Sequence, residues 1–263
     1  MAETVRTAEM SWREVEAAVA RGAAAFVPMG STEEHGPHAP TGDYLITDAI
    51  AEQVARQTGD VMIPTIPFSY SEYFRHYPGT VTVRAETLRL LVRDAVDGLL
   101  DQGFRHVVLF NGHKGNEPIL GPLIREIRRE RGLLVPIVAP LGFGTTPALV
   151  RELYGSAPTG HGGEPIGSIW AHLRPELIDL ERAEDFGSRP FLGLPTSGLN
   201  EVVFEGRAVG MAINMEDVTP PSGSLSDPRL ASADRGARIV ANSVAGLVGF
   251  VRWFKEVDPR VAP

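Results

Sequence analysis

Residues 25–48 read AFVPMGSTEEHGPHAPTGDYLITD, an apolar run that passes directly into a dense group of acids and histidines. In an extended strand, side chains two residues apart point to the same side, so Glu33 and His35 share a face while Glu34 points the other way. Turns rich in glycine and proline then fold the chain back and bring Asp43 into range. This pattern predicts a strand that ends in a metal site; the alternative is a polar surface loop.

Length, charge and composition narrow the class of protein. With 263 residues the chain can bury a substantial core, and we expect a single domain over residues 1–263. No apolar run approaches the roughly 20 residues of a membrane span, and a net charge of −8 disfavours nucleic-acid binding. The first residues lack an apolar signal core, and the absence of cysteine excludes thiol chemistry. These features predict a soluble, cytoplasmic protein that acts on a small molecule.

Alternating helical and strand patterns along the chain predict an α/β fold. Buried strands are predicted at residues 23–29, 61–67, 106–110 and 133–139. Helices are predicted from Ser11 to Gly22, from Thr47 or Asp48 through Ala55, over residues 87–102 and 117–131, from the glycines near residue 160 to Leu173, and over residues 227–257. Strands separated by helices form a mostly parallel sheet with helices on both faces, joined by right-handed crossovers.

A second polar cluster follows the predicted strand at residues 106–110. It reads Asn111-Gly112-His113-Lys114-Gly115-Asn116. In open parallel sheets, ligands bind beyond the carboxyl ends of the strands, so His113 is expected beside Glu33 and His35. Lys114 has three open interpretations: it stabilises an oxyanion, it binds an anionic or hydroxylated substrate, or it is an ordinary surface lysine.

A third polar cluster opens a later helix and reads Thr159-Gly160-His161-Gly162-Gly163-Glu164. A histidine and a glutamate three residues apart suit a site in which one group moves protons and the other binds a metal or orients a partner. A glycine-rich helix cap is the alternative. An aromatic loop at residues 69–83 is of the kind that often walls a pocket, whereas residues 184–229 show only strand-like pieces at 201–204 and 210–213.

Five motifs are spaced in order along nearly the whole chain. They are residues 30–38 (GSTEEHGPH), Pro78-Gly79-Thr80, Asn111-Gly112-His113, His161-Gly162-Gly163-Glu164 and Asp227-Pro228-Arg229-Leu230-Ala231. This set resembles the creatininase family of metal-dependent amidohydrolases. The resemblance implies a three-layer α/β/α sandwich with a mostly parallel central sheet, often assembled as a homohexamer. It also implies a site for two divalent ions of zinc, manganese or iron.

The resemblance assigns roles to four side chains. It implies that Glu33 and His113 bind one ion, that His35 binds the second, and that Asp43 bridges the two. The reasoning from the residues alone points to the same four. Mixed imidazole and carboxylate ligation suits zinc, manganese or ferrous iron and does not decide among them.

The bridging aspartate departs by one position from the family pattern. In the family it usually lies nine residues after the equivalent of His35, and that position is Tyr44 in this chain. Asp43 precedes it directly. Asp43 is preferred to Asp48 as the bridge, because Asp48 is interpreted as a helix cap.

The fifth family ligand is also missing from its usual positions. Members use a glutamate either two residues after the equivalent of His113 or five after that of His161, and this chain has Gly115 and Ile166 there. Glu164 is the nearby carboxylate that can replace it. Glu164 is therefore predicted as a metal ligand.

Three functions compete at this point. The first is hydrolysis of a small cyclic or formyl amide, in which a metal-activated water attacks the carbonyl and His161, or second Glu164, protonates the leaving group. The second is hydrolysis of a carbon–carbon bond in a cyclic diketone such as an oxidised inositol, and the third is a non-catalytic metal-binding subunit. A nucleotide substrate is disfavoured, because few cations, Arg75, Lys114 and Arg84, occur in the candidate loops.

Overall fold

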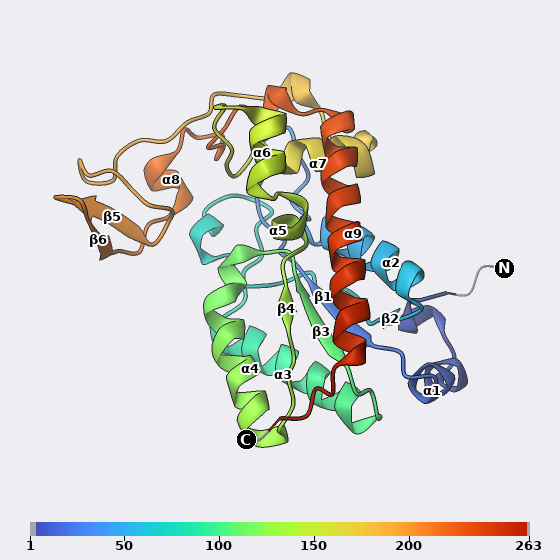
Figure 1. Cartoon of the computed structure of the whole chain (residues 1–263). Helices are drawn as coiled ribbons and strands as arrows, with labels where there is room; N and C mark the ends of the chain where they lie inside the picture. Colours follow the sequence, from blue (N-terminus) through green and yellow to red (C-terminus); the bar gives the residue numbers. More distant parts are fainter. Residues whose placement is uncertain (1–3, 262–263) are drawn as a thin grey trace.

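A four-stranded parallel sheet forms the centre of the computed structural model, which describes residues 4–261. Its strands are β1 (Ala25–Met29), β2 (Val61–Met62), β3 (Val107–Asn111) and β4 (Ile137–Val138), in the order β2-β1-β3-β4. All three neighbouring pairs are parallel. The predicted mostly parallel sheet is therefore confirmed (Figure 1).

Two layers of helices cover opposite faces of this sheet, and one short helix lies outside them. The layers contain α1 (Trp12–Ala20), α2 (Tyr44–Thr58), α3 (Ala85–Asp101), α4 (Glu117–Arg131), α5 (Pro140–Gly144), α6 (Pro147–Tyr154), α7 (Ile166–Leu173) and α9 (Ala233–Glu256), whereas α8 (Met215–Val218) lies away from the sheet. Helices α2, α7 and α9 pack with Phe26 and Phe110, while α1, α3 and α4 pack with Val27 and Leu109. Because successive strand residues point to opposite faces, this alternation produces the three-layer α/β/α sandwich seen in Figure 1.

Short 3₁₀ helices connect several of these elements. They are η1 (Thr7–Glu9), η2 (Glu72–Phe74), η3 (Lys114–Asn116), η4 (Pro175–Leu177), η5 (Leu180–Arg182) and η6 (Pro228–Leu230). Two of them, η2 and η3, lie next to the sheet edge where the polar clusters meet. No helix within residues 4–261 has the length and apolar composition that a membrane span requires.

The register of β1 and β3 places both polar clusters at one edge of the sheet. Ala25 pairs with Val107 and Met29 pairs with Asn111, so the two strands end level with each other. The Gly112 amide still donates to the Met29 carbonyl at 2.8 Å. The chain after each strand therefore leaves the sheet at the same place, as the sequence predicts.

Several predicted boundaries need correction. Helix α4 spans the predicted residues 117–131, but the last helix begins at Ala233 because the Asp227-Pro228 step starts η6 instead. Helix α2 begins at Tyr44, so the proposed capping role of Thr47 or Asp48 is wrong. Both lie inside the helix. Asp43 occupies the N-cap position, where the turn after the metal-rich loop ends.

Residues 191–218, which we call the arm, extend away from the sandwich (Figure 1). The arm carries an antiparallel hairpin of β5 (Glu201–Phe204) and β6 (Arg207–Gly210), so the strand expected at residues 210–213 lies three residues earlier. Its core is small. Its buried apolar cluster consists of Val202, Ile213 and Val218. Leu192 and Phe204, by contrast, are 78% and 52% exposed.

Candidate metal centre

A first group of possible metal ligands joins the ends of β1 and β3. Glu33, Asp43 and His113 each offer one ligand atom, and these atoms lie within 4.8 Å of one another. His113 Nδ1 lies 3.2 Å from Glu33 Oε2 and 3.9 Å from Asp43 Oδ2. All three side chains are buried. The structure thus gathers, from two separate polar clusters, three of the residues that the sequence selects.

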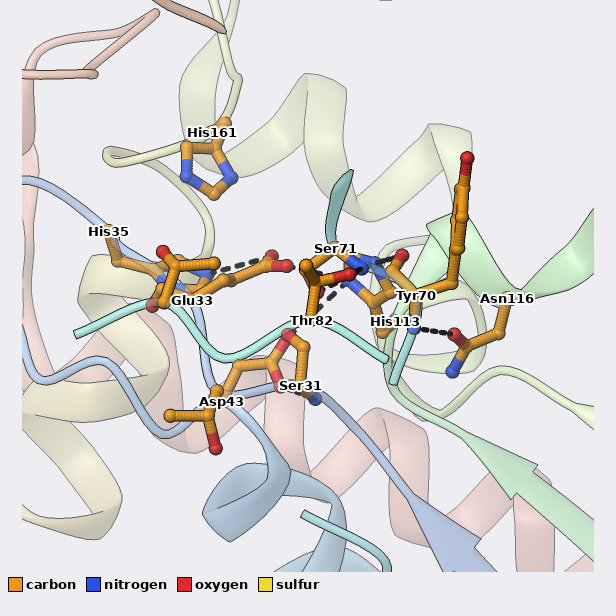
Figure 2. A network of polar contacts seen from close by, with 12 residues as sticks. Ser31, Glu33, His35, Asp43, Tyr70, Ser71, Thr82, His113, Asn116 and His161 are labelled. Atoms are coloured by element: carbon orange, nitrogen blue, oxygen red, sulfur yellow. Dashed lines mark hydrogen bonds and ion pairs between the residues drawn. The ribbon is translucent and has the colours of Figure 1, made fainter. Parts of the chain in front are cut away.

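A second group shares Glu33 with the first. It consists of Glu33, His35 and His161, whose ligand atoms also lie within 4.8 Å of one another. His35 Nε2 is 3.9 Å from Glu33 Oε1. Figure 2 shows His161 above His35 and Glu33, with His113 on the opposite side. The carboxylate common to both groups is Glu33, and the bridging role expected for Asp43 stays a prediction.

Hydrogen bonds fix which nitrogen of each imidazole faces Glu33. His113 Nε2 donates to the Tyr70 carbonyl oxygen at 3.0 Å, and His35 Nδ1 lies 3.2 Å from the Glu33 carbonyl oxygen. In each case the other ring nitrogen points toward a Glu33 carboxylate oxygen. Metal-binding histidines usually donate their second N–H in this way, because the donation fixes the tautomer and the ring orientation.

The ionisation of the first group fits a centre that takes up a cation. Burial and the charge of Glu33 raise the pKa of Asp43 to about 7. Burial lowers the pKa of His113, but the charge and hydrogen bond of Glu33, the charge of Asp43 and the hydrogen bond to Tyr70 together raise it to about 9. Protons on Asp43 and His113 thus compensate the buried negative charge of this group. A divalent ion would carry more positive charge into the same place and would displace these protons. The mixed oxygen and nitrogen donors suit zinc, manganese or ferrous iron.

Close packing between α2 and the strand ends places Asp43 in the group. A Cβ at Gly30 would lie 2.5 Å from the Tyr44 Cα, and one at Gly112 would lie 1.8 Å from Thr47 Oγ1. Both positions therefore exclude any side chain. The start of α2 lies directly against the strand ends, where the Ser31 amide donates to Asp43 Oδ1.

Asp48 has a different environment. Its carboxylate accepts hydrogen bonds from both terminal nitrogens of Arg6, at 2.9 and 2.6 Å, and from Thr65 Oγ1 at 2.7 Å. It belongs to neither ligand group. The structure therefore brings Asp43 and not Asp48 to the centre, although the reason given from sequence, a helix cap at Asp48, is wrong.

Glu34 is the residue that the sequence reasoning missed. His161 Nε2 donates to its carbonyl oxygen at 2.7 Å and to its Oε1 at 2.9 Å. Burial opposes charge on both groups, but their hydrogen bond and mutual attraction, with smaller contributions from neighbouring groups, together lower the pKa of Glu34 and raise that of His161. The His161 ring also stacks on Phe74 at 4.3 Å. No local pattern reveals the contact between Glu34 and His161, because the two residues are 127 positions apart in the sequence.

Glu164 does not join either group. Its side chain is fully buried, and Oε2 accepts hydrogen bonds from the hydroxyls of Tyr154 and Ser168, the latter at 2.6 Å. The Ser168 hydroxyl also accepts from the Ser232 amide at 3.0 Å. Glu164 thus connects α6, α7 and the start of α9 behind the loop that carries His161. This position does not supply the missing fifth ligand.

Local packing leaves no room for the family's glutamate at Gly115. A Cβ there would lie 2.4 Å from His113 Nε2 and 2.7 Å from the Tyr70 carbonyl oxygen. The hydrogen bond that orients His113 therefore occupies the space that a glutamate side chain would need. Ile166, at the other usual ligand position, lines the pocket with an apolar surface instead.

A pocket of about 560 Å³ opens onto the two ligand groups. The aromatic loop contributes Tyr73 and Phe74, so the expectation that this loop walls a pocket is confirmed. Lys114, which is exposed, and residues 197–200 of the arm also line the pocket. The volume suits a small molecule rather than a polymer.

Known proteins share this arrangement over most of the chain. Residues 8–251 match the family model Creatininase, described as creatinine amidohydrolase. The chain is 28% identical to the creatinine amidohydrolase of Pseudomonas putida, over 96% of this chain and 98% of that protein. It is 36% identical to the 3-dehydro-scyllo-inosose hydrolase of Thermotoga maritima, over 89% and 78%. It is 29% identical to the mycofactocin precursor peptide peptidase of Mycobacterium ulcerans, over 87% and 84%.

Solved structures agree in fold as well. A manganese form of creatininase superimposes with a TM-score of 0.80 at 28% identity, covering 97% of this chain and all of that chain. Another creatinine amidohydrolase structure gives 0.81 at the same identity and coverage. Family members are hydrolases, and the residues gathered at the sheet edge are of the kinds that bind divalent metals. The chain is a hydrolase that belongs to the creatininase family.

Proposed function

We propose that this protein hydrolyses the carbon–nitrogen bond of a small cyclic or formyl amide with the help of two divalent ions. The observation that carries the proposal is the pair of ligand groups sharing Glu33 at the floor of a pocket of small-molecule size. The likeness to creatinine amidohydrolase over nearly the whole chain supports it.

The ligands we propose are those gathered at the strand ends. Glu33, Asp43 and His113 would hold one ion and His35 would bind the second, with Asp43 as the proposed shared ligand. Divalent ions bound in such a site lower the pKa of water toward neutrality and polarise a carbonyl group. The surrounding side chains exclude bulk solvent and keep the imidazoles in one orientation.

We propose that His161 protonates the leaving nitrogen. Its ring lines the pocket, and its Nε2 proton is held by Glu34, so the pair stores a proton next to the ligand groups. Because Glu164 lies behind this loop, we assign it to positioning His161 and not to proton transfer. The position of Glu164 between Tyr154 and Ser168 supports that assignment.

A second candidate reaction is hydrolysis of a carbon–carbon bond in a cyclic diketone. It is favoured by the 36% identity to an inosose hydrolase. In that reaction water adds to a ketone, the carbon–carbon bond breaks, and the electron pair leaves as an enolate that takes up a proton. The same pocket and the same proton donor serve both reactions, so geometry alone does not separate them.

A substrate panel separates the two. The protein is stripped of metal with a chelator, reloaded with manganese or zinc, and incubated with lactams, formamides and cyclic 1,3-diketones, and the products are identified by mass spectrometry. The proposal expects hydrolysis of an amide that requires added metal. Turnover of diketones alone would move the function to carbon–carbon cleavage, and turnover that survives complete metal removal would overturn both.

A further inference from the structure

Lys114 stands at a rigidly fixed point beside the candidate metal centre. It is the first residue of η3 and follows His113 directly. The backbone on either side is closely packed, because a Cβ at Gly112 would meet Thr47 Oγ1 at 1.8 Å and one at Gly115 would meet His113 Nε2 at 2.4 Å. The Cα of Lys114 is therefore held in register with the metal ligands, while its long side chain remains free to adjust.

The ammonium group of Lys114 has no use within the described part of the chain. The sequence holds only two lysines, and the other, Lys255, pairs its Nζ with Asp60 Oδ1 at 2.6 Å. The Lys114 side chain makes neither a hydrogen bond nor an ion pair with any residue from 4 to 261, and it is exposed. Among the described residues that line the pocket, it is the sole lysine or arginine.

The neighbouring charge on the rim restricts what this cation can bind. Glu117 follows three residues later and also lines the pocket, yet no ion pair joins it to Lys114. The ammonium group attracts a negatively charged ligand, whereas the Glu117 carboxylate repels it, and this repulsion grows with each further negative charge on the ligand. Phosphate, which carries close to two charges at neutral pH, is disfavoured, whereas one carboxylate is suited.

We propose that Lys114 binds a carboxylate that the substrate carries apart from the bond that is cleaved. The preferred substrates are then small monoanionic amides, and Lys114 determines specificity. The inference that this carboxylate belongs to a substrate rests on the proposed function. The binding of a carboxylate by Lys114 does not, and equilibrium binding measurements detect it without turnover.

The test compares two probes with the same ring and different charge. The lactam 5-oxoproline carries a carboxylate, and 5-oxoprolinamide carries a neutral amide in its place. Calorimetry with the manganese-loaded wild-type protein is expected to show about tenfold tighter binding of 5-oxoproline. In Lys114→Met, which keeps the length of the side chain, that preference is lost because 5-oxoproline binds about tenfold more weakly, while 5-oxoprolinamide binds as before.

Two further variants sharpen the test. Lys114→Arg keeps the charge and is expected to retain most of the preference, whereas Arg75→Met removes a nearby cation that does not line the pocket and should change nothing.

If neither probe binds, or if Lys114→Met keeps the preference because a metal ion holds the carboxylate, the inference is overturned. Equal losses of rate for both probes with unchanged binding would also overturn it, since they indicate an oxyanion role. Charge-dependent binding without lactam hydrolysis would leave the inference standing and count against the proposed reaction.

Discussion

The metal centre and the arm are built in opposite ways, although both face the same pocket. Side chains at the centre are buried, hydrogen-bonded on more than one side, and placed by the register of two central strands. The arm is a two-stranded hairpin packed on a cluster of three buried apolar residues, and apolar side chains such as Leu192 remain exposed. A hairpin of this size is marginal by itself. The chemistry thus sits on the rigid part of the fold, and one wall of the pocket sits on the adaptable part.

A closely packed centre beside a less packed wall allows a fold to keep its ligands while the shape of its pocket changes. The relatives named above are a creatinine amidohydrolase, an inosose hydrolase and a peptide peptidase. Loops and extensions tolerate change better than strand ends do, because fewer buried contacts depend on them. We therefore expect substitutions at the centre to abolish turnover and substitutions in the arm to change substrate preference.

The largest expected effect comes from the ligands themselves. Asp43→Ala should lower kcat by at least about 1,000-fold, because it removes several kcal/mol of metal-based stabilisation of the transition state. Elemental analysis should show metal loss in parallel. Asp48→Ala is the matched control, since this carboxylate pairs with Arg6 away from the centre. An active Asp43→Ala protein together with an inactive Asp48→Ala protein would reverse the assignment.

Truncation of a buried side chain should lower the free energy of unfolding much more in the sandwich than in the arm. Leu109→Ala removes a fully buried side chain from β3 and should lower the free energy of unfolding by about 3 kcal/mol. Val202→Ala removes a buried side chain from the arm but should change the global free energy by less than about 1 kcal/mol, because the arm unfolds locally. Urea titrations followed by circular dichroism measure both. Equal losses would mean that the arm and the sandwich unfold as one unit.

Glu34→Gln tests whether the Glu34 carboxylate assists His161 in proton transfer. The amide keeps the shape of the side chain but removes the charge that raises the pKa of His161, and we expect kcat to fall about tenfold to 100-fold with KM nearly unchanged. Steady-state kinetics on an amide substrate measures the split. The control is Glu52→Gln on the far part of α2. A variant with wild-type kcat would show that Glu34 serves only the fold.

The smallest effect is expected in the arm. Asn200 lines the pocket and hydrogen-bonds the Tyr73 side chain across it. Asn200→Ala removes one hydrogen bond and should raise KM about threefold to tenfold while kcat stays within about twofold. Ser197→Ala, in the same loop, is a suitable comparison. A large fall in kcat would show that the arm takes part in the chemistry and would remove the contrast between the two regions.

Local signals in the sequence could predict much of the sandwich. The Ser11 and Glu14 spacing marks a capping box that the structure contains, and residues 117–131 form α4 as expected. The ends of two apolar strands also located Glu33 and His113 correctly at one edge, because parallel strands present their carboxyl ends together. Each of these features depends on neighbours within a few residues or on a general rule of parallel sheets.

Contacts between distant segments could not be predicted in the same way. The pairing of Glu34 with His161 depends on how the loop before α7 folds over the strand ends, and the placement of Glu164 depends on helices α6 and α9. The start of α2 was misplaced because Asp43 and Asp48 both resemble N-caps, and only packing against Gly30 decides between them. In the arm, the apolar residues alternate only weakly, so the second strand was predicted three residues later than its observed position.

The scarcity of lysine has a practical consequence for anyone who handles this protein. Amine-reactive dyes and coupling resins attack primary amines, and the only lysine side chains available are Lys114 and Lys255. The ammonium of Lys255 is held by the buried Asp60 carboxylate, whereas that of Lys114 is exposed on the rim of the pocket. Labelling or surface attachment through lysine would therefore place the tag over the entrance used by small molecules. Attachment through the two exposed carboxylates of α1, Glu14 and Glu16, or through an introduced cysteine, keeps that entrance open.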